Sequence, residues 1–251
     1  MTPNPSLDLL FRADRLSWDD ANRITQPRRR PGGQGINVVR AARALGGPAE
    51  AVAVALLGGA VGRELEAALT AEGTALRVVR IAGETRVFVG VREAETGRSL
   101  LLNPRGPPGG EAEVEALLEA VRRELASSEA AGRIAWVACC GSLPPGLPVE
   151  SFARIGALAR GRGHRFVPDT DGEALRLAAE EADLLVPNVH EAERLLGRRI
   201  ASAEVAAEAA AALVEAGPAL AVVTMGAEGA VAASKDGTWL AVPDLPASLA
   251  A

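Results

Sequence analysis

Pro31-Gly32-Gly33-Gln34-Gly35-Ile36-Asn37-Val38-Val39 is the stretch on which the reading of this chain depends, because three glycines run directly into a helical pattern. Glycine permits a positive φ and lets a ligand approach the backbone closely. The first N–H groups of the following helix are unpaired and point at the loop, which suits a phosphate or carboxylate. A Gly-rich turn between a strand and a helix is the equally simple alternative.

The composition of the 251-residue chain is ordinary for a globular protein, with 48% hydrophobic and 24% charged residues. A net charge of −5 argues against a broad nucleic-acid surface, and the short cluster Arg28-Arg29-Arg30 is interpreted as a solvated loop. No apolar run approaches the roughly 20 residues of a membrane helix, so no membrane partner is expected. The neighbouring Cys139 and Cys140 end an apolar strand pattern and are interpreted as buried thiols, which fits a cytoplasmic location.

Apolar runs that read as buried strands alternate with helical patterns along most of the chain. The expected strands are near 51–57, 134–138, 164–167, 184–186 and 220–223, and the expected helices lie near 65–72, 114–125, 151–160, 173–181, 191–196 and 204–216. Alternation of this kind predicts an α/β fold with a mostly parallel sheet flanked by helices.

Two segments depart from this alternation of strands and helices. Residues 9–30 mix apolar and polar side chains without helical periodicity, and residues 85–103 alternate around Val87, Val89 and Val91. Both are expected to form half-exposed antiparallel strands.

Five segments, in order along the chain, resemble the motifs of the ribokinase-like (PfkB) carbohydrate kinases. They are Asn4-Pro5-Ser6-Leu7-Asp8, the loop Gly32–Asn37, Gly141-Ser142-Leu143-Pro144-Pro145-Gly146, Pro187–Glu191 and Thr224–Ala230. The opening segment is most similar to the 1-phosphofructokinase and tagatose-6-phosphate kinase branch. The resemblance implies a three-layer core domain of residues 1–8, 31–84 and 104–251. It also implies a β-sheet lid of residues 9–30 and 85–103 that pairs into a homodimer.

The resemblance places a sugar-phosphate site at the amino-terminal motifs. The implied substrate-binding residues are Asp8, Gly32, Gly33, Gln34, Asn37 and Arg86. A carboxylate such as Asp8 can accept hydrogen bonds from two sugar hydroxyls, and the Arg86 guanidinium suits bidentate contacts to phosphate. Gln34 departs from the family, which usually has Lys there, so it can donate hydrogen bonds but carries no charge.

The later motifs imply binding of ATP and Mg²⁺. Asn188, Thr224, Gly226 and Gly229 would bind the nucleotide, and Glu191 would hold the metal through water, as Mg²⁺ chemistry allows. An Asn followed three residues later by Glu also predicts a capping box, and both roles are compatible. Asp169 and Gly172 belong to a segment similar to a family stretch near the active site. His190 is expected to be exposed.

No GxGD motif, which supplies the family's catalytic aspartate, is found in the sequence, so no catalytic residue is assigned. We therefore expect the carboxyl end to be truncated relative to the family pattern. We expect the same of the amino end, because Met1 sits where the last residues of the first core strand should be.

The function that these motifs imply is phosphorylation of a sugar phosphate by ATP, with an acceptor of the fructose 1-phosphate or tagatose 6-phosphate type. Two alternatives remain: a catalytically incomplete protein that binds a sugar phosphate, and a plain sugar or nucleoside kinase of the same superfamily. A dinucleotide site is disfavoured because neither the third glycine nor the downstream acidic residue of that fingerprint is present.

Overall fold

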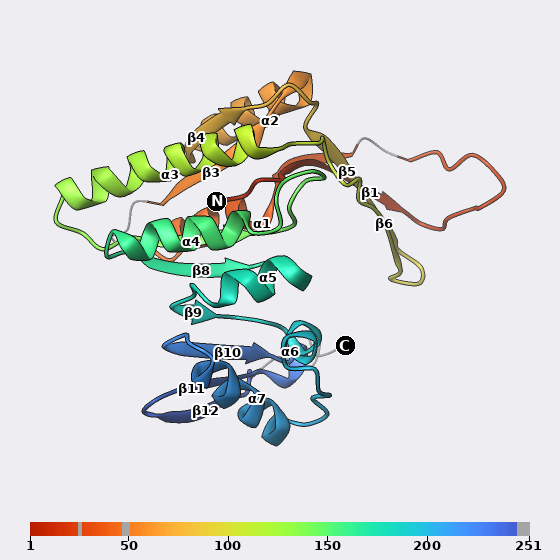
Figure 1. Cartoon of the computed structure of the whole chain (residues 1–251). Coiled ribbons are helices and arrows are strands. Elements are labelled where there is room, and N and C mark those ends of the chain that lie inside the picture. The colour runs from red at the N-terminus through yellow and green to blue at the C-terminus, as the bar shows by residue number, and fades with distance from the viewer. Residues whose placement is uncertain (25–26, 47–50, 245–251) are drawn as a thin grey trace. The chain divides into compact units, whose positions relative to one another are not determined.

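The computed structural model describes residues 1–24, 27–46 and 51–244. The chain divides into two compact units, which are described separately (Figure 1). Unit 1 comprises Met1–Ala120 with Cys140–Pro148, and unit 2 comprises Val121–Cys139 with Val149–Ala251. In the described part of the chain, none of the helices combines the length and the apolar character that crossing a bilayer requires.

Unit 1 holds a four-stranded sheet in the order β2-β1-β5-β6 and a parallel pair, β3 and β4. Its elements are β1 (Ser6–Ala13), β2 (Arg28–Gly32), α1 (Gln34–Ala44), β3 (Val52–Leu57), α2 (Gly59–Ala71), β4 (Ala75–Arg80), β5 (Arg86–Glu93) and β6 (Ser99–Leu102). Helix α3 (Glu111–Ala130) begins in this unit and ends in the other. Apolar side chains of α1, β3 and α2 form one core, which includes Ile36, Leu57, Leu65 and Leu69.

The four-stranded sheet is built from the two segments that break the alternating pattern. Antiparallel pairing is confirmed for β1 with β2 and for β5 with β6. The pairing of β1 with β5 is parallel, so the expectation of antiparallel strands throughout is wrong at the centre of the sheet. The interpretation of Arg28–Arg30 as a solvated loop is also wrong, because these residues form the edge strand β2.

The first two residues extend the parallel part of unit 1. The Thr2 N–H donates to the Val54 carbonyl over 2.9 Å, and the Met1 carbonyl accepts from the Cys140 N–H over 2.9 Å. Met1 and Thr2 are thus joined by backbone hydrogen bonds to Cys140 and to β3, respectively. The first motif follows at Asn4 and continues into β1.

Unit 2 alternates strands and helices and ends in an antiparallel meander. Its elements are β7 (Trp136–Cys140), α4 (Ser151–Gly161), β8 (Arg165–Asp169), α5 (Gly172–Ala179), β9 (Leu184–Leu185), α6 (Val189–Leu196), α7 (Ala203–Glu215), β10 (Leu220–Thr224), the short 3-10 helix η1 (Gly226–Glu228), β11 (Ala230–Ser234) and β12 (Gly237–Ala241). β7 pairs with β8, and the second sheet has the order β12-β11-β10-β9, with β9 and β10 parallel. The thiols of Cys139 and Cys140 at the end of β7 are buried, as predicted.

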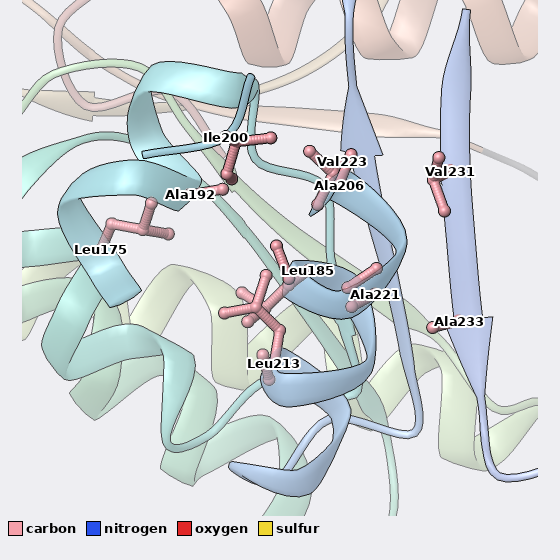
Figure 2. Packing of buried hydrophobic residues seen from close by; sticks show 13 residues of the cluster. Leu175, Leu185, Ala192, Ile200, Ala206, Leu213, Ala221, Val223, Val231 and Ala233 are labelled. Atoms are coloured by element: carbon pink, nitrogen blue, oxygen red, sulfur yellow. The ribbon is translucent and has the colours of Figure 1, made fainter. Parts of the chain in front are cut away.

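Small side chains allow α7 to pack closely on β10 and β11. Figure 2 shows Ala206 and Leu213 of α7 facing Ala221 and Val223 of β10, with Val231 of β11 beside them. Alanine keeps the helix interior favourable and takes up little space between helix and sheet. This core supports the end of β10 and the turn that follows it, where the predicted nucleotide-binding residues Thr224, Gly226 and Gly229 lie.

Helix α4 packs on β8 at a glycine. A Cβ at Gly156 would lie 2.6 Å from Cδ1 of Phe166 and 2.7 Å from Cβ of Glu181. The bare backbone at this position therefore allows the helix to approach the buried Phe166 ring.

We expect Gly156→Ala to lower the free energy of unfolding by about 1–3 kcal/mol, because overpacking a rigid contact costs that much. The change would ordinarily stabilise a helix interior by about 0.5–1 kcal/mol. Gly161, at the exposed end of the same helix, has open space around its Cα and provides the control substitution Gly161→Ala. Urea unfolding measures whether the free energy of unfolding falls in Gly156→Ala and rises in Gly161→Ala. A Gly156→Ala variant as stable as Gly161→Ala would contradict the packing.

Candidate functional site

Asp8 lies on β1 against the backbone of Gly32 on β2. A Cβ at Gly32 would lie 2.2 Å from Oδ1 of Asp8 and 2.4 Å from Oδ2, so no side chain fits there. The Ser6 hydroxyl donates to Oδ1 of Asp8 over 2.6 Å. Oδ1 is thus held from one side, and the half-exposed carboxylate keeps acceptor capacity for a ligand hydroxyl.

Arg86, at the start of β5, pairs in register with Ser6 of β1. Because side chains alternate along a strand, Ser6, Asp8 and Arg86 lie on the same face of the sheet. The Arg86 guanidinium donates to the Asn4 carbonyl through Nε (3.2 Å) and Nη2 (2.8 Å), and through Nη1 to Pro104 O (2.9 Å) and Asn103 Oδ1. All of these acceptors are neutral.

The electrostatics of Arg86 follow from this setting. Partial burial lowers the pKa of its guanidinium, and the nearby Asp8 carboxylate raises that pKa. Within the described residues no carboxylate forms an ion pair with Arg86. The site therefore presents a fixed positive charge whose geometry is set by carbonyl groups, beside an acceptor for hydroxyl groups.

Asn4 also belongs to this site. It was included in the first motif of the sequence analysis but was assigned no role there. Its Nδ2 donates to the Arg105 carbonyl (2.9 Å) and to the Ser142 hydroxyl (3.1 Å), so it joins the first and third motifs. Its Oδ1 is buried, has no hydrogen-bond partner among the described residues, and lies against the backbone of Gly106. Its place in the Asn4–Asp8 motif was the signal for this role.

The remaining residues of the glycine loop contact different parts of unit 1. Gly33 precedes α1 with a φ of 129°, which favours glycine, and its carbonyl accepts the first helical bond from the Asn37 N–H over 3.0 Å. The Gln34 carboxamide lies beside Gly141 of the third motif. Asn37 Oδ1 accepts from Arg30 Nη2 (2.9 Å) and Arg40 Nη1 (3.2 Å). The Asn37 amide is thereby oriented with Nδ2 as its remaining donor.

In unit 2, Asn188 and Thr224 are brought together by a parallel β-bridge, and the Thr224 N–H donates to the Pro187 carbonyl over 3.0 Å. Gly226 and Gly229 follow in the turn after β10, with φ values of 61° and 104°. A Cβ at Gly229 would lie 2.0 Å from the Ala241 carbonyl oxygen. The structure thus gathers all four predicted nucleotide-binding residues at the carboxyl end of β10.

The predicted capping box at the start of α6 is confirmed. Asn188 Oδ1 accepts from the Glu191 N–H over 3.0 Å, and Glu191 Oε2 accepts from the Asn188 N–H over 2.9 Å. His190, between them, is exposed as expected, with 80% of its side chain accessible.

The residues around this capping box also include the predicted Mg²⁺ ligand, Glu191. No group of three His, Cys, Asp or Glu side chains in the described ranges is arranged to hold a metal. Glu191 retains Oε1, and the neighbouring donors Asn188 and Thr224 offer oxygen atoms. Oxygen-only donors with few direct ligands are compatible with a Mg²⁺ ion that keeps most of its waters.

Asp169 closes β8 and is partly buried, which raises the pKa of its carboxyl group above the ordinary value. The folded state then binds the proton more tightly than the unfolded state, so ionising Asp169 opposes folding. The protonated carboxyl group therefore favours the folded state. This stabilisation is lost as pH rises from the ordinary Asp pKa of about 3.9 through the higher folded pKa.

We therefore expect Asp169→Asn to be more stable than the wild type at pH 7, with the difference shrinking as pH falls towards 4. Thermal unfolding of both proteins between pH 4 and pH 7.5 checks this sign. Asp171→Asn is an unsuitable control because Asp171 pairs with Arg194, so the exposed Asp14→Asn serves instead. An Asp169→Asn variant less stable than the wild type at neutral pH would contradict the claim that ionised Asp169 opposes folding.

Comparison with known proteins identifies the family to which this arrangement belongs. The profile of the pfkB family of carbohydrate kinases matches residues 1–248. The chain is 36% identical over 242 residues to a 1-phosphofructokinase of Rhodobacter capsulatus, covering 96% of this chain and 74% of the relative. Escherichia coli phosphofructokinase-2 in complex with fructose-6-phosphate has a TM-score of 0.87 and 29% identity over 98% of this chain and 79% of its own.

The tetrameric inhibited form of the same Escherichia coli enzyme also has a TM-score of 0.87, with 30% identity over 98% of this chain and 79% of its own. The α/β, ribokinase-like fold class is thereby confirmed. The division into a core and a lid remains a prediction, as do the roles of the individual site residues. With a profile match that runs nearly from end to end, the chain belongs to the pfkB family of carbohydrate kinases.

Proposed function

We propose that this chain transfers a phosphoryl group from ATP to a hydroxyl of a sugar phosphate, with an acceptor of the fructose 1-phosphate or tagatose 6-phosphate type. The observation that carries the proposal is the sheet face of unit 1, where Asp8 and Arg86 lie together. A hydroxyl acceptor and a fixed guanidinium on one face match the two chemical features of a phosphorylated sugar.

Each residue of this face has a distinct part in holding the acceptor. Asp8 would accept hydrogen bonds from sugar hydroxyls, Gly32 leaves room for that carboxylate, and Gly33 would let the sugar approach the backbone. Asn37 would donate through Nδ2, since its Oδ1 is already engaged by Arg30 and Arg40. Gln34 would add a neutral donor beside Gly141. Holding the acceptor in one orientation is itself a large part of catalysis.

Unit 2 would provide the nucleotide site. Thr224, Gly226 and Gly229 offer a tight turn with accessible backbone, and Asn188 lies beside Thr224. Glu191 would hold a Mg²⁺ ion through water, and such an ion would neutralise charge on the transferring phosphates. The capping box fixes the Glu191 carboxylate in one orientation before any ligand binds.

Replacing Arg86 by Ala is expected to raise KM for the phosphorylated sugar about 10–100-fold, since a hydrogen bond to a charged group contributes about 1.5–3 kcal/mol. The rate with the corresponding unphosphorylated sugar should change little. Initial rates of ADP release with fructose 6-phosphate, fructose 1-phosphate and free fructose measure this difference.

Arg12 on β1, which is exposed, provides a matched control as Arg12→Ala. The control should leave both KM values within about twofold of the wild type, because isolated surface charges contribute little. Equal losses for phosphorylated and free sugar in Arg86→Ala would exclude Arg86 as the phosphate-binding residue.

Assembly and location are further parts of the proposal. β6 forms the other edge of the four-stranded sheet and carries the exposed Leu101 and Leu102, which supports a homodimer formed through this lid. The buried thiols of Cys139 and Cys140 suit a reducing compartment and support a cytoplasmic location. Sedimentation velocity distinguishes a dimer from a monomer.

A further inference from the structure

Four arginines surround an open hollow in unit 1. The hollow has a volume of about 300 Å³ and is lined by Arg28, Arg29 and Arg30 of β2, Arg40 of α1, and Glu72 at the end of α2. The hollow lies along the edge strand, so its opening is not closed by another strand of the described sheet.

Two of the four arginines are neutralised by carboxylates of α2. Arg29 donates to Glu64 through Nε and Nη2, both over 2.8 Å. Arg40 donates to Glu72 through Nε (2.9 Å) and Nη2 (2.7 Å to Oε2), and its Nη1 donates to the Pro31 carbonyl over 2.8 Å. These bidentate pairs fix two walls of the hollow and neutralise the two guanidinium charges.

The other two arginines keep both their charge and their donors. Arg30 gives a single hydrogen bond, from Nη2 to the neutral Asn37 Oδ1 over 2.9 Å. Arg28 is exposed, and its guanidinium makes no hydrogen bond or ion pair with another described residue. Residues two apart on a strand point to the same face, so Arg28 and Arg30 extend side by side from the edge. The hollow therefore carries two unneutralised guanidinium groups.

We propose that this hollow is a binding site for a phosphate-class anion, held by Arg28 and Arg30. Planar guanidinium groups match the oxygen spacing of phosphate, and two adjacent ones repel each other until an anion lies between them. The volume exceeds that of a single phosphate group, so the ligand can be a small phosphorylated molecule. Arg86, which lies on β5, is not among the residues that line this hollow.

The position of Arg30 connects this anion site to the sugar site. Arg30 pairs in register with Asp8 of β1, and its guanidinium holds the Asn37 amide. An anion on Arg30 therefore touches the group that orients Asn37. The anion has two potential sources: free phosphate in solution, or the phosphate of the acceptor sugar. The second source rests on the proposed function, whereas the first does not.

Titration calorimetry with inorganic phosphate at constant ionic strength tests the site. The proteins are the wild type, Arg28→Ala, Arg30→Ala, Arg86→Ala and the exposed control Arg63→Ala on α2. Binding should weaken about 10-fold or more in Arg28→Ala and Arg30→Ala, because charge-assisted hydrogen bonds are lost. Arg63→Ala should stay within about twofold of the wild type, and Arg86→Ala should keep the binding that depends on Arg28 and Arg30.

Kinetics with fructose 6-phosphate and free fructose distinguish the two sources. If the sugar provides the phosphate, Arg28→Ala raises KM about 10-fold for the phosphorylated sugar alone. If free phosphate is the ligand, Arg28→Ala leaves that KM unchanged and only the calorimetric binding is lost. The proposal is overturned if Arg28→Ala matches the wild type in both measurements, or if Arg86→Ala alone loses phosphate binding. Loss of binding in Arg28→Ala with normal turnover in Arg86→Ala would overturn only the proposed function.

Discussion

Asp8→Asn is expected to lower kcat/KM for a phosphorylated sugar about 10²-fold or more while leaving thermal stability nearly unchanged. Each hydrogen bond to a charged group contributes about 1.5–3 kcal/mol, and the carboxylate is placed to accept more than one. Asparagine retains the shape of aspartate and can still accept from the Ser6 hydroxyl, which now lies 2.6 Å from Oδ1. Steady-state ADP release and thermal unfolding of the purified variant measure the two quantities.

Asp14→Asn provides the matched control for this prediction. Asp14 follows β1, is exposed, and lies outside the sheet face that carries Asp8 and Arg86. The control should keep kcat/KM within about twofold, as expected for a surface charge. An Asp8→Asn enzyme that retains more than about a third of wild-type activity would contradict the assignment of Asp8 to the sugar.

Phe166→Ala is expected to lower the free energy of unfolding by about 3–5 kcal/mol, because truncating a buried aromatic side chain leaves a cavity. Phe166 is fully buried in β8 and meets Gly156 of α4, where no side chain separates the helix from the ring. Its backbone also exchanges hydrogen bonds with Asp183, from the Phe166 N–H to Oδ2 (2.9 Å) and from the Asp183 N–H to the Phe166 carbonyl (2.9 Å).

Denaturation in urea checks this value, with Phe166→Leu as the conservative partner. Leucine refills most of the space and should lose much less stability than alanine. The slope of the free energy against urea should stay the same in both variants, since the folded surface is unchanged. A loss below about 1 kcal/mol in Phe166→Ala would show that the ring is not part of a rigid core.

The helices of this fold could be predicted from local periodicity. Val114, Leu117 and Val121 recur at helical spacing, and all three are buried on α3. Leu65 and Leu69 are buried on α2 in the same way, and Gly73 follows with a φ of 68°. A helix is fixed by neighbours three and four positions away, so the signal is contained in the sequence itself.

Strand burial was predicted less well because it depends on partners far away in sequence. Residues 134–138 were interpreted as a buried strand, yet β7 spans Trp136–Cys140, and Ile134 and Trp136 are 65% and 58% exposed. The Ala135 N–H donates to Nδ1 of His164 over 3.1 Å, which fixes the residue that precedes the strand. An apolar run alone does not tell which face of a sheet is covered.

The edge strand β2 is a case in which the local sequence pattern did not predict a strand that forms. Arg28 to Arg30 carry no alternation of apolar and polar side chains, so a solvated loop was the natural interpretation. The strand forms because β1 provides an antiparallel partner from Ser6 to Leu10, and charged side chains are tolerated on an edge. The parallel pairing of β1 with β5 is likewise set by a long connection that no local pattern reveals.

For the candidate site, the sequence named residues but not the contacts that join them. The family resemblance named Asp8, Gly32 and Arg86, and the structure brings these three to one sheet face. The motifs did not reveal that the Asn4 carbonyl accepts from Arg86 or that Asn4 Nδ2 donates to Ser142, because these hydrogen bonds link residues 82 and 138 positions apart. Side-chain contacts of this kind follow from the fold rather than from spacing.

The most direct test of the central claim is ADP release by the 251-residue chain with ATP, Mg²⁺ and a panel of acceptors. The panel comprises fructose 1-phosphate, fructose 6-phosphate, tagatose 6-phosphate and free fructose. The account predicts turnover that depends on one of the phosphorylated sugars and is weak or absent with free fructose. ADP release that no phosphorylated sugar stimulates, or that free fructose stimulates equally, would contradict it.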